Sequence, residues 1–443
     1  MTSHWMQHSV YHFTPLANLP TILQHGLLSI NEQQRLGLPI RPLAGQPVME
    51  HRSQLRVPAG PGGVVLNYVP FYFSHLTHML LLIISNKVVD EQRILHIEMP
   101  LTLIGRYPTV FTDAPTFPGS NPNFYTDPAD LQNLDWATID APAWQLEKIN
   151  LRTPRLSELL VHRQVPMREA TRIIVWDNDV AEAVRQVYTD FNLTPPRIET
   201  DPAFYFFDPQ SDGRLPAIVG PGQIREETKR TVDQILRARR QSLRRRFPGL
   251  LELRNALRHD LRALPETAEL AGLETDNKVH FEDVGAHTLR VVNVVRSSPE
   301  FAALDPADQV LLEVATYLHD IGKGPKSRWQ ATGGKQQIDM NHPVKALPML
   351  ARILTEEVTC IDGEQIDLLT RLVVYHDLIG GILVSGRRIE ELLAAFHSER
   401  EVDMLFILAR ADSVAINPDW EHPEVRERLK RETLQAIKQS QQH

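Results

Sequence analysis

The chain has 443 residues, of which 42% are hydrophobic and 23% charged, with a formal net charge of -8 at pH 7 and one cysteine, Cys360. This length suits two or three domains, and this composition excludes a peptide, a collagen or coiled-coil rod and a largely disordered chain. One cysteine excludes an intrachain disulfide and a cysteine-based zinc site, so any metal must be held by histidine and carboxylate side chains.

The first 195 residues alternate short strands with short helices. Apolar and β-branched content predicts strands at residues 64–66, 68–73, 80–84, 94–97 and 173–176. A helix is predicted at residues 16–25, where Gly26 ends it, and another at residues 180–188. This pattern is typical of an α+β domain.

The most apolar run, residues 79–85, is far shorter than the roughly 20 residues that a membrane-spanning helix needs. We expect it to be a buried strand. The N-terminal residues show neither a basic start nor a continuous apolar stretch nor a small-residue cleavage site, so no secretory signal is predicted. The expected location is the cytoplasm, with no membrane partner.

Prolines and glycines are frequent between residues 194 and 222, which places a domain boundary there. Residues 224–247 then form a predicted helical stretch rich in basic side chains: Lys229, Arg230, Arg237, Arg239, Arg240, Arg244, Arg245 and Arg246. A solvated helix face explains such a stretch, and so does a contact with nucleic acid. From about residue 266 onward the apolar residues follow a 3.6-residue period, which predicts helices throughout.

We therefore expect a multidomain chain with three parts. An α+β domain occupies residues 9–195, and an all-α domain occupies residues 266–430. Between them, residues 196–265 form a Pro/Gly-rich linker and the basic helical segment.

The N-terminal segment 10–29 has the pattern of a strand, a polar turn, a helix and a glycine stop. Three further features accompany it: residues 57–73 with Gly62-Gly63, residues 124–136 with Phe-Tyr-Thr-Asp and Leu-Asp-Trp, and Glu158 before an apolar run. Together they resemble DarT, a toxin family that moves ADP-ribose from NAD onto bases of single-stranded DNA. The resemblance covers about residues 9–195 and implies an ADP-ribosyltransferase fold with NAD as co-substrate.

The DarT resemblance implies roles for six residues: His12, Phe13, Thr14, Ser29, Arg52 and Glu158. The first three match the segment that lies along the NAD, and Ser29 follows the first helix near it. Glu158 matches the catalytic glutamate and Arg52 the catalytic arginine, with Arg56 as the alternative. The chemistry agrees, because rupture of the nicotinamide–ribose bond passes through an oxocarbenium-like state that a carboxylate stabilises, while a guanidinium can hold pyrophosphate. Without the resemblance, Glu158 reads as a surface glutamate before a buried strand.

The C-terminal domain carries side chains of the types that bind divalent metals: His287, His319, Asp320, His342, His376 and Asp412. Imidazole nitrogens and carboxylate oxygens on separate helices can converge on one pocket. The order His, His-Asp, Asp and the text Leu-His-Asp-Ile-Gly-Lys resemble the HD phosphohydrolase superfamily and its two-metal branch, over about residues 275–420. A GYP-type segment is missing after His342, so a cyclic dinucleotide substrate is not implied.

The HD resemblance implies that His287, His319, Asp320 and Asp412 are the ligands common to the superfamily. The other two histidines would serve a second metal, and Lys323 would face the phosphate. Two divalent ions about 3.5 to 4 Å apart polarise a phosphoryl group and supply a hydroxide at neutral pH. We therefore expect one or two divalent ions and phosphoester hydrolysis, with the substrate open.

Together the halves predict an NAD-dependent ADP-ribosyltransferase acting on nucleic acid, joined to a metal-dependent phosphohydrolase or phosphodiesterase. Single-stranded DNA is the expected partner, RNA stays open, and the toxin resemblance implies an antitoxin partner. Two alternatives remain. One is a metal-dependent nucleotide phosphohydrolase whose N-terminal half only binds nucleotide or nucleic acid. The other is a sensor whose first half recognises nucleic-acid ends while the helical half acts as a scaffold.

Overall fold

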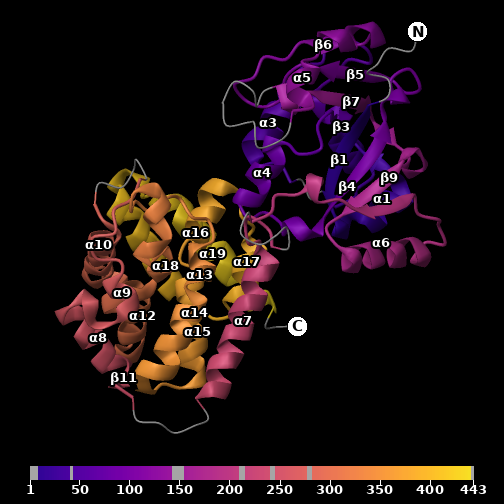
Figure 1. Cartoon of the computed structure of the whole chain (residues 1–443). Coiled ribbons are helices and arrows are strands. Elements are labelled where there is room, and N and C mark those ends of the chain that lie inside the picture. Colours follow the sequence, from indigo (N-terminus) through magenta and orange to yellow (C-terminus); the bar gives the residue numbers. More distant parts are fainter. Residues whose placement is uncertain are drawn as a thin grey trace. The chain divides into compact units, whose positions relative to one another are not determined.

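The computed structural model describes residues 8–39, 43–141, 154–208, 215–239, 245–276 and 282–440. It divides into two compact units, Met1–Gly220 (unit 1) and Pro221–His443 (unit 2) (Figure 1). Unit 1 contains the sheet and unit 2 is almost entirely helical. The fold classes predicted for the two halves are thus confirmed.

Unit 1 is built on an eight-stranded sheet with the order β10-β9-β4-β1-β3-β7-β5-β6. The sheet is antiparallel except for the parallel pair of β9 and β10, and a separate two-stranded sheet joins β2 to β8. The strands are β1 (Ser9–Pro15), β2 (Leu27–Leu28), β3 (Tyr68–Tyr72), β4 (Ile94–Pro100), β5 (Thr109–Thr112), β6 (Phe124–Tyr125), β7 (Glu158–His162), β8 (Gln164–Val165), β9 (Arg172–Val175) and β10 (Arg197–Thr200).

Helices cover both faces of this sheet. They are α1 (Leu19–His25), α2 (Ile30–Arg35), α3 (Gln46–Gln54), α4 (His78–Ser85), α5 (Trp136–Ile139) and α6 (Asn178–Asp190). Side chains alternate along β4, so Leu95 packs with α1 and α6 on one face while Ile94 packs with α4 on the other. Gly26 ends α1 at a φ of 79°, as its position in the sequence predicted.

Two strand predictions in this half are wrong. Residues 80–84 belong to α4, because the Thr77 hydroxyl caps the helix by accepting a hydrogen bond from the Leu80 amide at 3.2 Å. An apolar run of this length reads equally well as a buried strand or a buried helix, and the cap decides. Residues 65–67 form a 3-10 turn rather than a strand.

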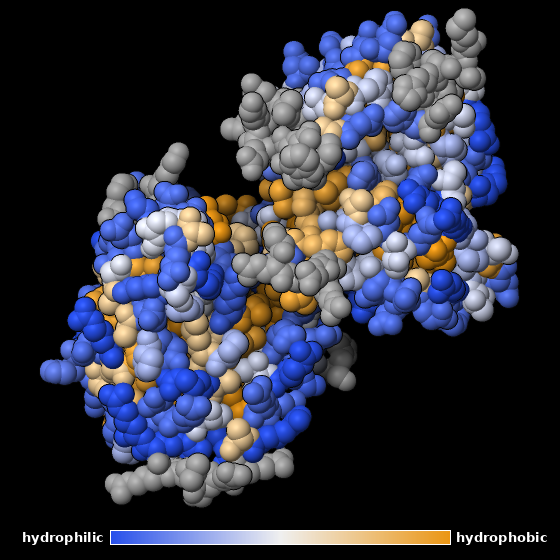
Figure 2. Space-filling view, in the orientation of Figure 1, coloured by the Kyte–Doolittle hydropathy of each residue, from blue (hydrophilic) through white to orange (hydrophobic). Residues whose placement is uncertain are grey.

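Unit 2 is a helical bundle with one short parallel strand pair, β11 (Phe247–Gly249) and β12 (Val358–Cys360). The helices are α7 (Pro221–Ala238), α8 (Leu250–His259), α9 (Pro265–Ala268), α10 (Val284–Ser297), α11 (Pro299–Ala302), α12 (Pro306–Leu318), α13 (His342–Lys345), α14 (Leu347–Arg352), α15 (Gly363–Val374), α16 (Leu378–Gly380), α17 (Ile389–Ala395), α18 (Glu399–Ile416) and α19 (Pro423–Ser440). The visible outer face of this unit is mostly hydrophilic (Figure 2), as expected of helices whose apolar stripes pack inward.

The segment 196–265, expected as a linker with a basic helix, is shared between the two units. Its beginning is β10, an edge strand of the sheet, whereas α7, β11 and α8 lie in unit 2. Arg239 donates hydrogen bonds to the carbonyls of Val358 at 2.7 Å and Thr359 at 2.6 Å, and Arg246 donates to the carbonyl of Ala263 at 2.7 Å. These arginines join the segment to its own bundle.

Three other basic residues of this stretch face the solvent. Lys229, Arg230 and Arg237 are exposed, and Arg230 pairs with Glu227 at 2.7 Å. Arg240 and Arg244 lie outside the described residues. Part of the basic stretch is therefore structural and part is a solvated face.

Within the described ranges, no single helix has the length and apolar content to cross a membrane. One bent pair, Gly363–Val374 with Leu378–Ser385, meets the criterion on length and composition alone.

The buried carboxyl group of Glu91 predicts that the stability of unit 1 depends on pH. Glu91 is 1% exposed and accepts a hydrogen bond from the Phe206 amide at 2.7 Å. Burial raises the pKa of Glu91 from 4.5 to about 8, so the folded state binds a proton more tightly than the unfolded state. The stabilising effect of that proton is full below the ordinary pKa and is lost as the pH rises through about 8.

We expect the free energy of unfolding of Glu91→Gln, relative to that of the wild type, to rise by up to about 1.4 kcal/mol for each pH unit between about pH 4.5 and 8. The measurement is urea unfolding at pH 5 and pH 8, with amide exchange in β4 and β9 reporting on unit 1. Glu182→Gln, on an exposed position of α6, is the control. A stability difference that does not change with pH would contradict the prediction.

Candidate active site and candidate metal centre

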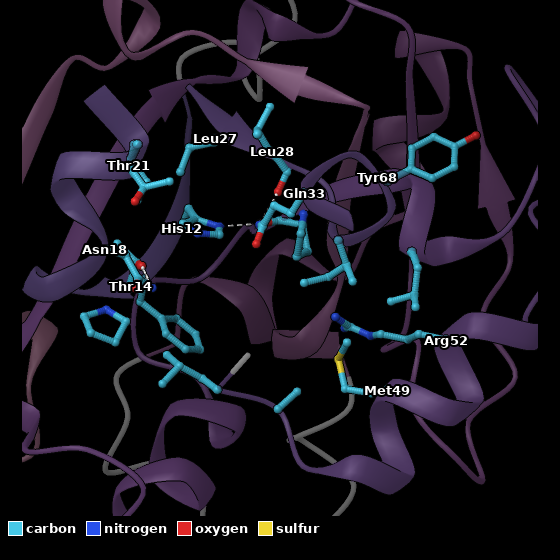
Figure 3. Close-up of a pocket in the computed structure, with 18 of the residues that line it drawn as sticks. His12, Thr14, Asn18, Thr21, Leu27, Leu28, Gln33, Met49, Arg52 and Tyr68 are labelled. Atoms are coloured by element: carbon cyan, nitrogen blue, oxygen red, sulfur yellow. Dashed lines mark hydrogen bonds between the residues drawn. The ribbon is translucent and has the colours of Figure 1, made fainter. Parts of the chain in front are cut away.

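Unit 1 contains a pocket of about 340 Å³ that β1, α1, α2, α3 and β3 surround (Figure 3). His12, Thr14 and Asn18 lie on one side of it, and Arg52 and Met49 lie on the other. The polar residues that line it are His12, Thr14, Asn18, Thr21, Gln33, Arg52, Tyr68 and Tyr72. The remaining lining is mostly apolar, which suits a ligand with flat rings and a polar backbone.

The strand side of the pocket presents neutral polar groups. The Nδ1 atom of His12 lies 2.9 Å from the carbonyl of Pro70. A carbonyl only accepts, so this nitrogen carries the proton and Nε2 is left as an acceptor. Burial lowers the pKa of His12, which keeps the ring neutral. The Asn18 amide donates to the Thr14 hydroxyl at 3.1 Å and thereby ties the start of α1 to β1.

The opposite wall contains a buried ion pair. The Arg52 guanidinium, on α3, donates to Oε1 of Glu158 at the start of β7. Arg52 is 8% exposed and Glu158 is 0% exposed. Burial alone lowers the pKa of Arg52, but Glu158 and Tyr72 outweigh it and raise that pKa, so the guanidinium stays charged. Breaking such a pair would leave a charge uncompensated in the interior.

Two further residues complete this network. The Thr116 hydroxyl donates to Oε2 of Glu158 at 2.5 Å, and the Thr116 amide donates to the same oxygen at 3.2 Å. Tyr72 lies opposite Glu158 in the pairing of β3 with β7, and it is stacked on Phe13 with ring centroids 5.7 Å apart. Burial and the nearby Glu158 raise the pKa of Tyr72, so its hydroxyl stays protonated.

The predicted residues of this half do not all occupy the pocket. His12, Phe13, Thr14 and Arg52 line it. Glu158 lies behind Arg52 and is not among the lining residues. Ser29 is 2% exposed, and its hydroxyl caps α2 by accepting from the Glu32 amide at 3.3 Å.

The alternative arginine, Arg56, is exposed and forms an isolated bridge with Val64. Sequence analysis missed Gln33, Asn18 and Thr116. Gln33 had a usable sequence signal, because it lies one turn after a serine that can cap a helix. In the structure its side-chain amide donates to the Leu28 carbonyl at 3.0 Å. Thr116 had none, since it lies in a proline-rich loop far from Glu158 in the sequence.

In unit 2 all six predicted ligands converge. They lie on or just after α10, α12, α13, α15 and α18, which Figure 1 labels. Within the described residues they form two groups of possible metal ligands, and in each group the ligand atoms lie within 4.8 Å of one another. The first group is His287, His319 and Asp412, and the second is Asp320, His342 and His376. The six residues come from five separate stretches of the chain.

Asp320 connects the two groups. Its Oδ2 lies 3.3 Å from Nε2 of His319, and its Oδ1 lies 3.4 Å from Nε2 of His342 and 3.8 Å from Nε2 of His376. Atoms that bind one ion at about 2.1 Å and about 90° to 110° apart lie about 3.0 to 3.4 Å from each other. The separations from Asp320 to His319 and to His342 fit that spacing, and the separation to His376 is about 0.4 Å longer.

The backbone fixes which nitrogen faces the centre. Nδ1 of His319, His342 and His376 lies 2.7, 2.8 and 2.7 Å from a backbone carbonyl, respectively. Each Nδ1 therefore carries the proton, and each Nε2 presents its lone pair inward, as metal-binding histidines do. Nε2 of His319 and Oδ1 of Asp320 are buried without a hydrogen-bond partner. Such acceptors are what a bound cation would satisfy, so the residues fit a divalent metal.

The electrostatics of this centre also favour a cation. Burial alone raises the pKa of Asp320, but Lys323 and His319 outweigh it and hold that pKa well below its ordinary value. Burial lowers the pKa of His319, yet Asp320 and Asp412 raise it to about 10, so without a cation its Nε2 takes up a proton, which a bound metal ion would displace. The ionised carboxylates of Asp320 and Asp412 therefore favour a positive charge between them. Lys323 supplies part of it, with Nζ 2.6 Å from Oδ2 of Asp320.

Two family models match the chain. The model described as "ssDNA thymidine ADP-ribosyltransferase, DarT" matches residues 11–206, and the HD domain model matches residues 284–376. The second match includes five of the six converging ligands. Asp412 lies beyond it, and only the fold brings that carboxylate to the others.

Individual relatives agree with the first of these matches. A DNA ADP-ribosyl transferase of Thermus sp. (strain 2.9) is 32% identical over 187 residues, which cover 41% of this chain and 88% of that protein. A DNA ADP-ribosyl transferase of Escherichia coli O127:H6 is 27% identical over 197 residues, which cover 43% of this chain and 89% of that protein. The solved structure of Thermus sp. 2.9 DarT in complex with NAD+ is 29% identical, covers 45% of this chain and 98% of that one, and has a TM-score of 0.40. The chain therefore belongs to the DarT family through its N-terminal half and carries an HD domain in its C-terminal half.

Proposed function

We propose that unit 1 transfers ADP-ribose from NAD to a base of single-stranded DNA and releases nicotinamide. The observation that carries this proposal is the buried pair of Arg52 and Glu158 at the wall of the pocket, formed by residues 106 positions apart. Membership of the DarT family, whose relatives are DNA ADP-ribosyl transferases, supports the reaction and the substrate.

The chemistry assigns a role to each charge. The bond between nicotinamide and the ribose C1′ breaks, and positive charge develops on the ribose. The Glu158 carboxylate stabilises that charge and orients the ribose hydroxyls, while Arg52 binds an anionic group of the substrate. A ring nitrogen of the base then attacks C1′ and loses its proton. Nicotinamide leaves as a neutral molecule, so no oxidant or metal is required.

The strand side of the pocket would bind the cofactor. His12, Phe13 and Thr14 would lie along the NAD, and Phe13 with Tyr72 offers an aromatic surface for one of its rings. Ser29 would act through the position of α2, because its hydroxyl already caps that helix.

We propose that unit 2 is a phosphohydrolase or phosphodiesterase with one or two divalent ions. His287, His319 and Asp412 would hold one ion and His342 and His376 the other, with Asp320 shared between them. Bound divalent ions would polarise a phosphoryl group and supply a hydroxide. Lys323 would bind a phosphate oxygen from its place beside Asp320.

Several wider assignments are part of the same proposal. Single-stranded DNA is the partner that the family favours, and RNA is a second strand to test. An antitoxin would be needed in the cell to limit the transferase. The cytoplasm, where NAD and DNA occur together, is the proposed location.

One observation favours a second candidate function. Glu158 is fully buried and both of its oxygens accept hydrogen bonds, so in this conformation the pocket presents Arg52 but no free carboxylate. The same geometry around Glu158 is expected of a chain whose unit 1 only binds nucleotide or nucleic acid and whose unit 2 is an active phosphohydrolase.

The test is incubation of the full chain with labelled NAD and a panel of single-stranded DNA and RNA oligonucleotides of different base composition. We expect the mass of one ADP-ribosyl group on DNA strands that contain the target base, with release of an equal amount of nicotinamide. Nucleotide binding without any transfer, on every strand tested, would support the second candidate and overturn the transferase.

A further inference from the structure

Thr116 is a buried polar residue in a loop, and its surroundings demand an explanation. It lies between β5 and β6, is 0% exposed, and belongs to no helix or strand. A buried hydroxyl in irregular backbone is costly unless it is hydrogen-bonded. Its partners are therefore informative.

All three polar groups of Thr116 contact the buried ion pair. Its hydroxyl and its amide both donate to Oε2 of Glu158, at 2.5 and 3.2 Å. Its carbonyl accepts from Nε of Arg52 at 3.2 Å. One residue thus contacts both members of the pair from outside the pocket lining.

The loop itself is fixed to the same glutamate. The Glu158 amide donates to the Thr112 hydroxyl at 3.2 Å, and that hydroxyl donates to the Ala114 carbonyl at 2.7 Å. The turn from residue 112 to 116 is therefore held at both ends against the start of β7. This gives the Thr116 hydroxyl a defined position relative to Glu158.

The two oxygens of Glu158 consequently have different partners. Oε1 accepts from the Arg52 guanidinium, and Oε2 accepts from Thr116. Arg52 lines the pocket, so an anionic substrate can compete for its guanidinium, whereas Thr116 cannot leave its oxygen without moving the loop. Binding of the substrate would free Oε1 and leave Oε2 held.

We propose that Thr116 is a positioning residue for ADP-ribosyl transfer, which holds Oε2 so that Oε1 is the oxygen presented to the ribose. This inference rests on the transferase function proposed above. It assigns no chemistry to Thr116 itself. The hydroxyl acts by keeping the carboxylate in one orientation, and small errors in such an orientation are expensive in rate.

The test is steady-state kinetics of DNA ADP-ribosylation by Thr116→Val, which keeps the shape of the side chain and removes the hydroxyl. We expect kcat to fall by about 100-fold while the KM for NAD changes by less than about 3-fold. Thr116→Ser, which keeps the hydroxyl, should stay within about 3-fold of the wild type in kcat. Thr116→Ala lacks the same hydroxyl and should show the same loss as the valine variant.

Unit 1 offers a matched control. Thr171, just before β9, also donates through its hydroxyl to a glutamate, Oε1 of Glu98, at 3.3 Å. It does not line the pocket, so Thr171→Val should leave kcat unchanged.

Three results would overturn the proposal: a wild-type kcat in Thr116→Val or Thr116→Ala, an equal loss in the serine variant, or a change in KM alone. Failure of the transferase itself is distinguishable, because it would appear as no transfer by the wild type.

Discussion

The Glu158→Gln variant is expected to lose ADP-ribosyl transfer to DNA by at least about 100-fold, because an amide cannot stabilise the positive charge that develops on the ribose. Glutamine has nearly the shape of glutamate, but its one carbonyl oxygen can accept from only one of Arg52 and Thr116, and its amide nitrogen faces the other. The pocket should still bind NAD, because Glu158 does not line it. The measurement is the rate of oligonucleotide modification, with NAD affinity from calorimetry beside it.

The choice of glutamine matters because the site is buried. Both variants remove the negative charge beside Arg52, but Glu158→Ala would also leave a cavity and remove every acceptor for Arg52 and Thr116 at this position, at a cost of about 3 to 5 kcal/mol in stability. A loss of activity in that variant would not separate catalysis from folding. Glu169→Gln is the matched control, since Glu169 is buried and pairs with Arg106 at 2.8 Å but does not line the pocket. Transfer by Glu158→Gln at the rate of this control would contradict the assigned role.

Only part of the N-terminal site could be predicted from the sequence. Residues 10–29 predicted a strand and a helix with a glycine stop, and the structure confirms both as β1 and α1. Local signals of that kind need no tertiary information. The family resemblance implied a role for Arg52 and a role for Glu158, but nothing in the sequence predicted the contact between them, because it joins a helix to a strand 106 residues away. Thr116 was missed for the same reason, since its value lies entirely in long-range contacts.

Residues 80–84 show a different limit. Their apolar side chains fit a strand or a helix equally, and the choice of α4 depends on a threonine cap and on packing of Ile84 and Leu80 with Ile94. The DarT resemblance also implies that the loop of about residues 119–158 shapes the base-binding site, and the structure describes this loop only up to residue 141 and from residue 154.

More of the metal centre could be predicted from the sequence. Six side chains with metal-binding atoms are rare enough as a set to stand out in a helical sequence, and all six converge. The HD resemblance assigned His342 and His376 to a second metal, but the sequence predicted neither the position of Asp320 beside those two histidines nor the backbone carbonyls that orient the imidazoles. Those carbonyls belong to the residues three positions before each histidine, a relation that any helical turn provides and that no residue type reveals.

The shared position of Asp320 leads to the prediction with the largest effect in unit 2. Its two oxygens lie 3.3 to 3.8 Å from the Nε2 atoms of His319, His342 and His376, so it is the one carboxylate that contacts both groups of the described ligand set. Asp412 contacts only the first group, with Oδ1 2.9 Å from Nε2 of His287 and 3.7 Å from Nε2 of His319. The two carboxylates should therefore differ in what their loss removes.

We expect Asp320→Asn to lose nearly all bound divalent metal and at least about 100-fold of the hydrolysis of a simple phosphodiester such as bis(p-nitrophenyl) phosphate. Asp412→Asn should lose the metal of one group and keep that of the other. The measurements are metal content by mass spectrometry after dialysis against a Mn²⁺ buffer, and the hydrolysis rate. Asp367→Asn, a half-exposed carboxylate on α15 that pairs with Arg371, is the control and should match the wild type in both.

The comparison of the two variants is what makes this prediction specific to the structure. Equal metal loss in Asp320→Asn and Asp412→Asn would mean that the six ligands form a single site rather than two that share a carboxylate. Full metal content in Asp320→Asn would contradict the ligand role of this residue altogether. Lys323 gives an independent check, because its ammonium pairs with Asp320 but cannot bind a metal cation while charged. Lys323→Ala should therefore keep its metal and lose only hydrolysis, which separates holding the ions from binding the phosphate.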